Sequence, residues 1–153
     1  MNVLERGFYH YMADIFTPQK RSEVMRRIHA EDTRPEIRVR RFLSQHGLHY
    51  RLHSKHLPGK PDIVLSKRMT VIFVHGCFWH GHACKIGSGK RRPKDNCEYW
   101  NAKIEKNILR DKENEVKLSE LGWKVIKVWE CQSMSEESLS AVLGPLFESE
   151  ENV

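Results

Sequence analysis

Residues 75–84, HGCFWHGHAC, bring three histidines and two cysteines together directly after an apolar run. Zinc in a structural site is bound by Cys sulfur and His nitrogen in a closed tetrahedron. Cys77, His82 and Cys84 supply three such ligands at a spacing that lets one loop surround an ion. Cys131 is the best candidate for the fourth ligand. We therefore predict a metal site, against the alternative of unrelated buried cysteines and surface histidines.

The same ten residues contain two histidines beyond the number that one zinc ion needs. His75 and His80 are therefore free for other chemistry, and His80 is the first to consider. The unperturbed pKa of histidine suits the uptake of a proton from water near neutral pH. A reactive group beside a metal-stabilised loop is the interpretation that follows.

The composition describes a folded domain with an excess of positive charge. The chain has 153 residues, of which 39% are hydrophobic and 30% charged, so one domain with a sizeable core is expected. A net charge of +6 favours a polyanionic partner, and nucleic acid is the natural one. The basic residues serve either as phosphate contacts or as solvated helix faces. They cluster at Lys20-Arg21, Arg26-Arg27, Arg38 with Arg40-Arg41, and Lys90-Arg91-Arg92.

Membrane and export signals are missing from the sequence. No apolar run approaches the roughly 20 residues of a membrane span, and the N-terminus has no signal-peptide pattern. We therefore expect a cytoplasmic protein, whose four cysteines are ligands or free thiols rather than disulfides. Residues 1–11 precede Met12, where translation could also start. We treat residues 1–17 as a flexible extension and residues 18–153 as a single domain.

Hydrophobic periodicity predicts helices and strands in a mixed order. A weak helical pattern covers residues 22–30, and Thr33, Pro35 and Glu36 form a clear helix start. Further elements are expected as strands at 62–65, 71–74 and 123–129, a long helix at 98–121 and a final helix from 135. This order predicts an α/β domain with a mixed central sheet flanked by helices.

The predicted elements also position polar residues. Trp100, Ile104 and Ile108 mark the buried stripe of the long helix, and Asp111 lies on that same stripe. An acid that faces inward needs a partner, which Lys103 or Lys112 of the same helix could provide.

Three further residues stand at strand ends. Asp62 begins one strand, His75 follows the next, and Cys131 follows the third. A mixed sheet can bring such positions to one edge. We therefore expect the metal loop and Asp62 to lie together.

At this point the motifs resemble those of a known family. Pro61-Asp62, two apolar strands and the loop at 75–84 resemble the very-short-patch repair (Vsr-type) DNA mismatch endonucleases. Supporting motifs are Arg21-Ser22 to Met25, Thr33-x-Pro35-Glu36, Pro58 to Asp62, Asn107 to Asp111, Leu121-Gly122-Trp123, and Val128 to Cys131. The resemblance spans about Pro18 to Met134.

This resemblance implies a restriction-endonuclease-like fold and a specific reaction. It implies nicking of one DNA strand 5′ of the mispaired T in a T:G mismatch, the lesion left by deaminated 5-methylcytosine. It further implies a catalytic Mg²⁺, a structural Zn²⁺, double-stranded DNA as partner and contact with mismatch-repair proteins. The resemblance also implies a bacterial protein that is a monomer and acts at the nucleoid.

The resemblance also carries over roles to single residues. Asp62 matches the magnesium-binding aspartate, and Val74 stands where a backbone carbonyl contacts that ion. His80 matches the histidine that handles the attacking water. The further active-site matches are His75, Glu36 and Asp111. The zinc ligands match Cys77, His82, Cys84 and Cys131, and the aromatic residues that wedge into DNA match Phe78, Trp79 and Trp100.

Each role has a structural alternative. Glu36 fits a capping box as well as a catalytic acid, and Asp62 could simply start a strand, although Asp is depleted inside strands. Trp100 fits the core as well as a wedge. Phe78 and Trp79 are stronger wedge candidates, because a loop beside a metal gives them little core to fill.

Departures from the family leave other functions open. Val74 stands where one member has Thr, which matters if the hydroxyl rather than the carbonyl is used, and Cys97 has no assigned role. One alternative is a restriction-type nuclease that acts on matched or modified DNA. Another is a zinc-stapled DNA-binding protein without catalysis.

Overall fold

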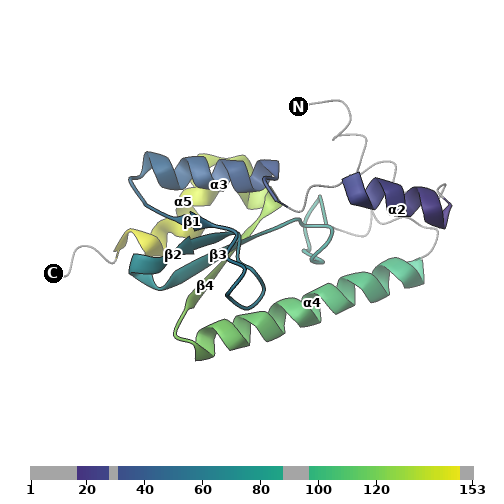
Figure 1. Ribbon diagram of the computed structural model, residues 1–153. Coiled ribbons are helices and arrows are strands. Elements are labelled where there is room, and N and C mark those ends of the chain that lie inside the picture. Colours follow the sequence, from purple (N-terminus) through teal and green to yellow (C-terminus); the bar gives the residue numbers. More distant parts are fainter. Residues whose placement is uncertain (1–16, 28–30, 88–96, 149–153) are drawn as a thin grey trace.

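The computed structural model describes residues 17–27, 31–87 and 97–148 (Figure 1). Helices and strands follow one another in the order α2 (Pro18–Arg27), α3 (Arg34–Gln45), β1 (Arg51–Leu52), β2 (Ile63–Leu65), β3 (Thr70–His75), α4 (Cys97–Glu120), β4 (Lys124–Trp129) and α5 (Glu136–Leu143). Short 3-10 helices are η1 (Ser66–Arg68), η3 (Glu130–Met134) and η4 (Gly144–Leu146). The predicted α/β class with a mixed sheet is confirmed.

The sheet has four strands in the order β1-β2-β3-β4. The first two pairs are antiparallel, and β3 and β4 are parallel. A parallel pair needs a long crossover, and α4 provides it. Because β3 and β4 run in the same direction, their carboxyl ends, His75 and Trp129, lie side by side. This edge is where the predicted loop and Cys131 begin.

Helices cover both faces of the sheet (Figure 1). On one face, Ile72 and Val128 pack with Val39 of α3 and Leu143 of α5 in a single buried cluster. On the other face, Val71 packs against Leu118 of α4 and its neighbours. Fully burying an aliphatic side chain stabilises a fold by roughly 1.5–3 kcal/mol. The alternation along β3 therefore fixes which of its side chains face α4.

Local sequence signals set the ends of the helices. Thr33 caps α3, since its hydroxyl accepts a hydrogen bond from the Glu36 N–H. The long helix ends as predicted, because Gly122 adopts φ 84°, a left-handed conformation that suits glycine. The helix expected at 22–30 starts earlier than its weak pattern indicates: α2 begins at Pro18, and residues 28–30 lie outside the described part.

Other expectations fall partly or wholly outside the described residues. The N-terminal extension is one, since only Thr17 of residues 1–17 is described. Lys90-Arg91-Arg92 also lies outside. Within the described residues, no helix is long and apolar enough to cross a membrane.

Candidate active site and neighbouring Cys-His cluster

A cleft of about 840 Å³ opens at the carboxyl ends of β3 and β4, between α4 and the start of α3. It collects most of the residues that the sequence singled out. The cleft is lined by Glu36, Asp62, Val74, His75, Trp79, His80 and Asp111 among others. These residues come from two helices, two strand ends and the loop after β3, so only the tertiary fold brings them together.

Asp62 lies immediately before β2 and points toward β3. Its Oδ2 accepts a hydrogen bond of 2.7 Å from the Val74 N–H, and its carbonyl accepts one of 3.0 Å from His53 N–H. Burial, together with the negative charge of Glu36, raises the pKa of Asp62 to about 6, although the hydrogen bond from Val74 works against this rise. The carboxyl group is therefore costly to keep ionised near neutral pH.

His80 and Asp111 form a hydrogen-bonded pair through Nδ1 and Oδ2. The inward-facing acid on the long helix thus has the partner that it needs, which is His80 rather than Lys103 or Lys112. Burial works to raise the pKa of Asp111, but the hydrogen bond and charge of His80 outweigh it, so the pKa is lowered. When Nδ1 of a neutral imidazole donates a hydrogen bond, Nε2 carries the lone pair that a general base requires.

His75 lies beneath His80 with parallel rings. The two ring centroids are 3.9 Å apart, and the planes differ by 5°. Burial lowers the pKa of His75 to about 3, with His80 as the next contribution, so His75 is neutral near pH 7. Its Nδ1 is buried and has no hydrogen-bond partner among the described residues.

Glu36 is held by a dense network at the start of α3. Its Oε1 accepts from the Thr33 hydroxyl at 2.9 Å, and its Oε2 accepts from the Asp32 N–H and from Arg40, both at 3.0 Å. Half of the expected capping box is present, because Thr33 caps the helix while the Glu36 carboxylate bonds to the Asp32 N–H rather than to the Thr33 N–H. The Glu36 side chain also lines the cleft, where its charge acts on Asp62.

The aromatic residues form a cluster between the loop and α4. Phe78 and Trp100 are each 2% exposed, with ring centroids 5.7 Å apart. The expectation that Phe78 has little core to fill is therefore wrong, because α4 supplies that core. Trp79 packs edge-on against Trp100 at 5.9 Å but is only partly buried and faces the cleft.

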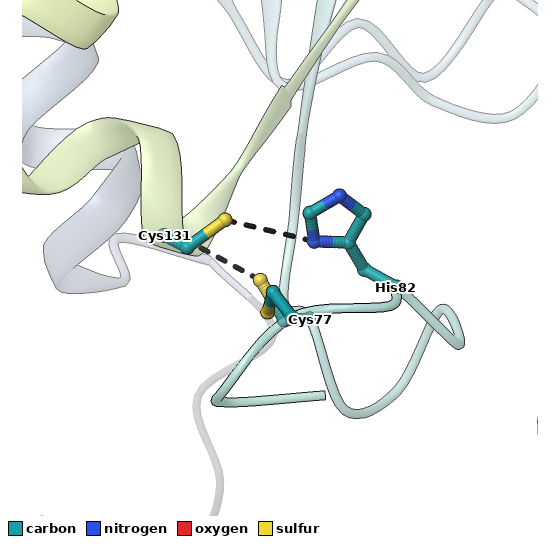
Figure 2. A group of neighbouring side chains, drawn as sticks. Cys77, His82 and Cys131 are labelled. Atoms are coloured by element: carbon teal, nitrogen blue, oxygen red, sulfur yellow. Dashed lines mark hydrogen bonds between the residues drawn. The ribbon is translucent and has the colours of Figure 1, made fainter. Parts of the chain in front are cut away.

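The four predicted metal ligands meet on the far side of the loop. Donor atoms of Cys77, His82, Cys84 and Cys131 all lie within 4.8 Å of one another. Figure 2 shows Cys131, just after β4, facing Cys77 and His82 of the loop. The Cys131 Sγ lies 3.6 Å from His82 Nδ1, and the Cys131 N–H donates to Cys77 Sγ at 3.4 Å. The sequence prediction that Cys131 joins the loop residues is matched by this geometry.

The surroundings of the cluster fit a bound metal ion. Burial works to raise the pKa of Cys84, but backbone N–H groups such as that of Gly87, 3.3 Å from the sulfur, lower it overall. Such N–H donors favour the thiolate that a metal requires. Gly87 itself approaches so closely that a Cβ there would lie 2.1 Å from the His82 carbonyl oxygen. Three sulfurs and one imidazole are a donor set typical of structural zinc. Cys97, exposed at the first residue of α4, is not part of this group.

Several residues that connect the cluster to the cleft could not be assigned a role from the sequence. The Glu130 carboxylate accepts from the Cys77 N–H at 3.3 Å, and Trp129 stacks on His82 at 4.3 Å. Asn107 donates from Nδ2 to the Trp79 carbonyl at 2.9 Å. All three residues stand within the motifs Asn107 to Asp111 and Val128 to Cys131 that carry the family resemblance, but the sequence alone gave them no role.

Comparisons with known proteins show which family the chain resembles. Residues 13–86 match the family model described as DNA mismatch endonuclease Vsr. The type II nicking enzyme V.NmeAIP of Neisseria meningitidis serogroup A is 54% identical, over 79% of this chain and 84% of its own length. The type II nicking enzyme V.XorIIP of Xanthomonas oryzae is 46% identical, over 86% of this chain and 95% of its own length. The DNA mismatch endonuclease Vsr of Escherichia coli is 42% identical, over 84% of this chain and 81% of its own length.

Proposed function

The chain belongs to the Vsr family of DNA mismatch endonucleases, and on this premise we propose that it nicks one strand 5′ of the mispaired T in a T:G mismatch. The protein is a DNA endonuclease, as its relatives are. The mismatch, the side of the nick and the magnesium dependence are the proposal. A restriction-endonuclease-like fold is part of it, supported by the four-stranded mixed sheet with helices on both faces.

The observation that carries the proposal is the His80–Asp111 pair in one cleft with Asp62. Hydrolysis of a phosphodiester needs a water that loses its proton as it attacks phosphorus. In our proposal, the Nε2 atom of His80 takes that proton. Asp111 fixes the ring orientation and stabilises the imidazolium that forms, and the neutral His75 supports the ring from below.

A magnesium ion fits the carboxylate side of the cleft. Asp62 is partly buried, its pKa is raised, and one of its oxygens is fixed by the Val74 N–H. We propose that the other oxygen binds Mg²⁺ together with the Val74 carbonyl, for which valine serves as well as threonine. When bound, the ion would polarise the phosphate oxygens and make water more acidic.

Selection of the mismatch is assigned to the aromatic cluster. Trp79 is its cleft-facing member, while Phe78 and Trp100 support it from the core. Unstacking a base step costs roughly a few kcal/mol, and a mismatch lowers that cost. We propose that all three rings enter or brace the opened step, with Trp79 making the first contact.

The Cys-His cluster is proposed to hold a structural zinc ion. The cluster ties the loop after β3 to the residue after β4, and His75 and His80 lie on or beside that loop. A zinc ion there would stabilise the fold and keep both histidines in place. Contact with mismatch-repair proteins and a monomeric state stay proposals from the family resemblance. The division into an extension at residues 1–17 and a single domain at residues 18–153 stays a prediction from the sequence.

The names of two relatives favour one alternative function. Both are described as type II nicking enzymes, which leaves open a nuclease that acts at a matched or modified site. Product analysis separates the two possibilities. A duplex with one T:G pair and an otherwise identical matched duplex are incubated with Mg²⁺ and resolved on native and denaturing gels. A single nick confined to the T strand of the mismatch supports the proposal, and cutting of one or both strands of the matched duplex to the same extent contradicts it.

A further inference from the structure

Lys127 stands where the sheet would be expected to carry an apolar residue. In the parallel register, Lys127 of β4 is the partner of Phe73 of β3, so both side chains project from the same face. Near the C-terminal end of α4 the same face of the sheet is apolar, because Val71, Val125 and Leu118 pack together there. Parallel strands covered by helices are usually near-continuous apolar runs. A lysine at this point therefore needs an explanation.

Packing and stability explain the lysine poorly. Its ammonium pairs with the Glu115 carboxylate of α4 at 3.0 Å, and both side chains are 38% exposed. Ion pairs that are this open to solvent contribute little to stability. Replacing an ion pair by apolar residues of similar volume often leaves the stability unchanged. The pair does, however, place a cation inside the cleft beside His75.

The charges of the cleft suggest what the cation is for. Five acids and four bases line it, although the family acts on a polyanion. Several of the bases are engaged within the protein. Arg110 pairs with Asp111 at 3.3 Å, and the Lys103 ammonium lies 5.5 Å from the centre of the Trp79 ring. A phosphate entering the cleft therefore has to compete with existing partners for each such cation.

We propose that Lys127 binds a DNA phosphate in the cleft, and that Glu115 holds the ammonium in position until the phosphate displaces it. Exchange is favourable because a phosphate accepts charge-assisted hydrogen bonds and releases counterions, whereas the exposed Glu115 carboxylate returns to water. The inference rests on the proposed function, because it takes this cleft as the site that receives DNA.

The test measures DNA binding as a function of salt in magnesium-free buffer, where no cleavage occurs. Fluorescence anisotropy is recorded on the T:G duplex and on the matched duplex. Loss of one phosphate contact lowers the steepness of log K against log salt by about 0.9. We expect this change for Lys127→Met, with about tenfold weaker binding. Lys127→Arg should keep the wild-type slope, and Lys124→Met is the matched control, since Lys124 is exposed at the opposite end of β4.

Glu115 provides the second arm of the test. Glu115→Gln frees the ammonium and should tighten binding several-fold, and this gain should disappear when Lys127→Met is also present. An unchanged slope for Lys127→Met overturns the inference, as does an equal gain from Glu115→Gln in both backgrounds. Nicking assays on the same duplexes keep the two proposals separate. Absence of T:G nicking by wild-type protein contradicts the proposed substrate, while the salt slopes still decide the role of Lys127.

Discussion

The Nδ1 atom of His80, in the loop after β3, is hydrogen-bonded to a carboxylate oxygen of Asp111, which lies 31 residues further along the chain on α4. This contact joins the loop that holds the Cys-His cluster to the helix that forms the opposite wall of the cleft. It also orients Nε2 of His80 as a proton acceptor. The proposed catalysis depends on this pair more than on any other contact.

Asp111→Asn should slow nicking by about 10²–10⁴-fold while the protein stays folded, because an amide can donate to Nδ1 and so favour the wrong tautomer. Single-turnover rates on the T:G duplex measure the effect. Glu113→Gln, an exposed position on the same helix, is the matched control and should keep the wild-type rate. A wild-type rate for Asp111→Asn would remove this residue from the mechanism.

Asp62→Asn should make the magnesium-free protein more stable while abolishing nicking. In the unfolded chain the Asp62 carboxyl has its ordinary pKa of 3.8, whereas burial in the folded protein raises that pKa to about 6. The folded state therefore binds more protons between these values, and its free energy of unfolding falls as pH rises through this window. At pH values above this window, Asp62→Asn should raise the free energy of unfolding by on the order of 1–3 kcal/mol.

Urea unfolding at about pH 7.5 and about pH 4 checks this prediction, because the gain should be large at the higher pH and small at the lower. Added Mg²⁺ should stabilise the wild-type protein and not the variant. Equal stability of the two proteins at both pH values would show that burial of Asp62 carries no cost.

Cys84→Ser and Cys131→Ser should each lower zinc content and stability together, by several kcal/mol, since a structural metal supplies folding free energy. Metal analysis and thermal unfolding of purified protein provide the two readouts. Cys97→Ser is the matched control and should preserve both, because Cys97 lies outside the cluster. Full zinc occupancy in either cluster variant would exclude that residue as a ligand.

Phe78 and Trp79 should respond differently to truncation. Phe78→Ala opens a cavity in the buried cluster and should destabilise the protein by about 3–5 kcal/mol. Trp79→Ala, at the partly exposed cleft position, should cost less stability and reduce the preference for T:G over matched duplex more than total DNA affinity. Competition binding between the two duplexes measures this preference. An equal loss of affinity for both would argue against a wedge.

Local patterns were sufficient to predict much of this arrangement. Thr33 and Gly122 act through their own backbone neighbourhoods, so the helix boundaries they set could be read from sequence. Helical periodicity placed Asp111 on the inward face, and the spacing of Cys77, His82 and Cys84 indicated their cluster. Each of these signals depends on residues within one or two turns of chain.

Features that depend on distant residues could not be predicted in the same way. The short strand β1 pairs with β2 through Arg51 and Leu52. Both residues are exposed, and two residues are too few to show an alternating apolar pattern. Burial of Phe78 depends on Trp100, and the network around Glu36 depends on Arg40 and other groups brought together by folding. Tertiary packing determines this strand pairing, this burial and these hydrogen bonds, and the spacing of residues in the sequence does not indicate them.

The most direct test of the central claim is a magnesium-dependent nicking assay on two duplexes that differ only in one T:G pair, comparing wild-type protein with Asp62→Ala and His80→Ala. We predict a single nick 5′ of the mispaired T by the wild-type protein, lost without Mg²⁺ and in both variants. Cleavage of the matched duplex alone, or nicking that survives both substitutions, would contradict the assignment of this cleft as a mismatch-specific active site.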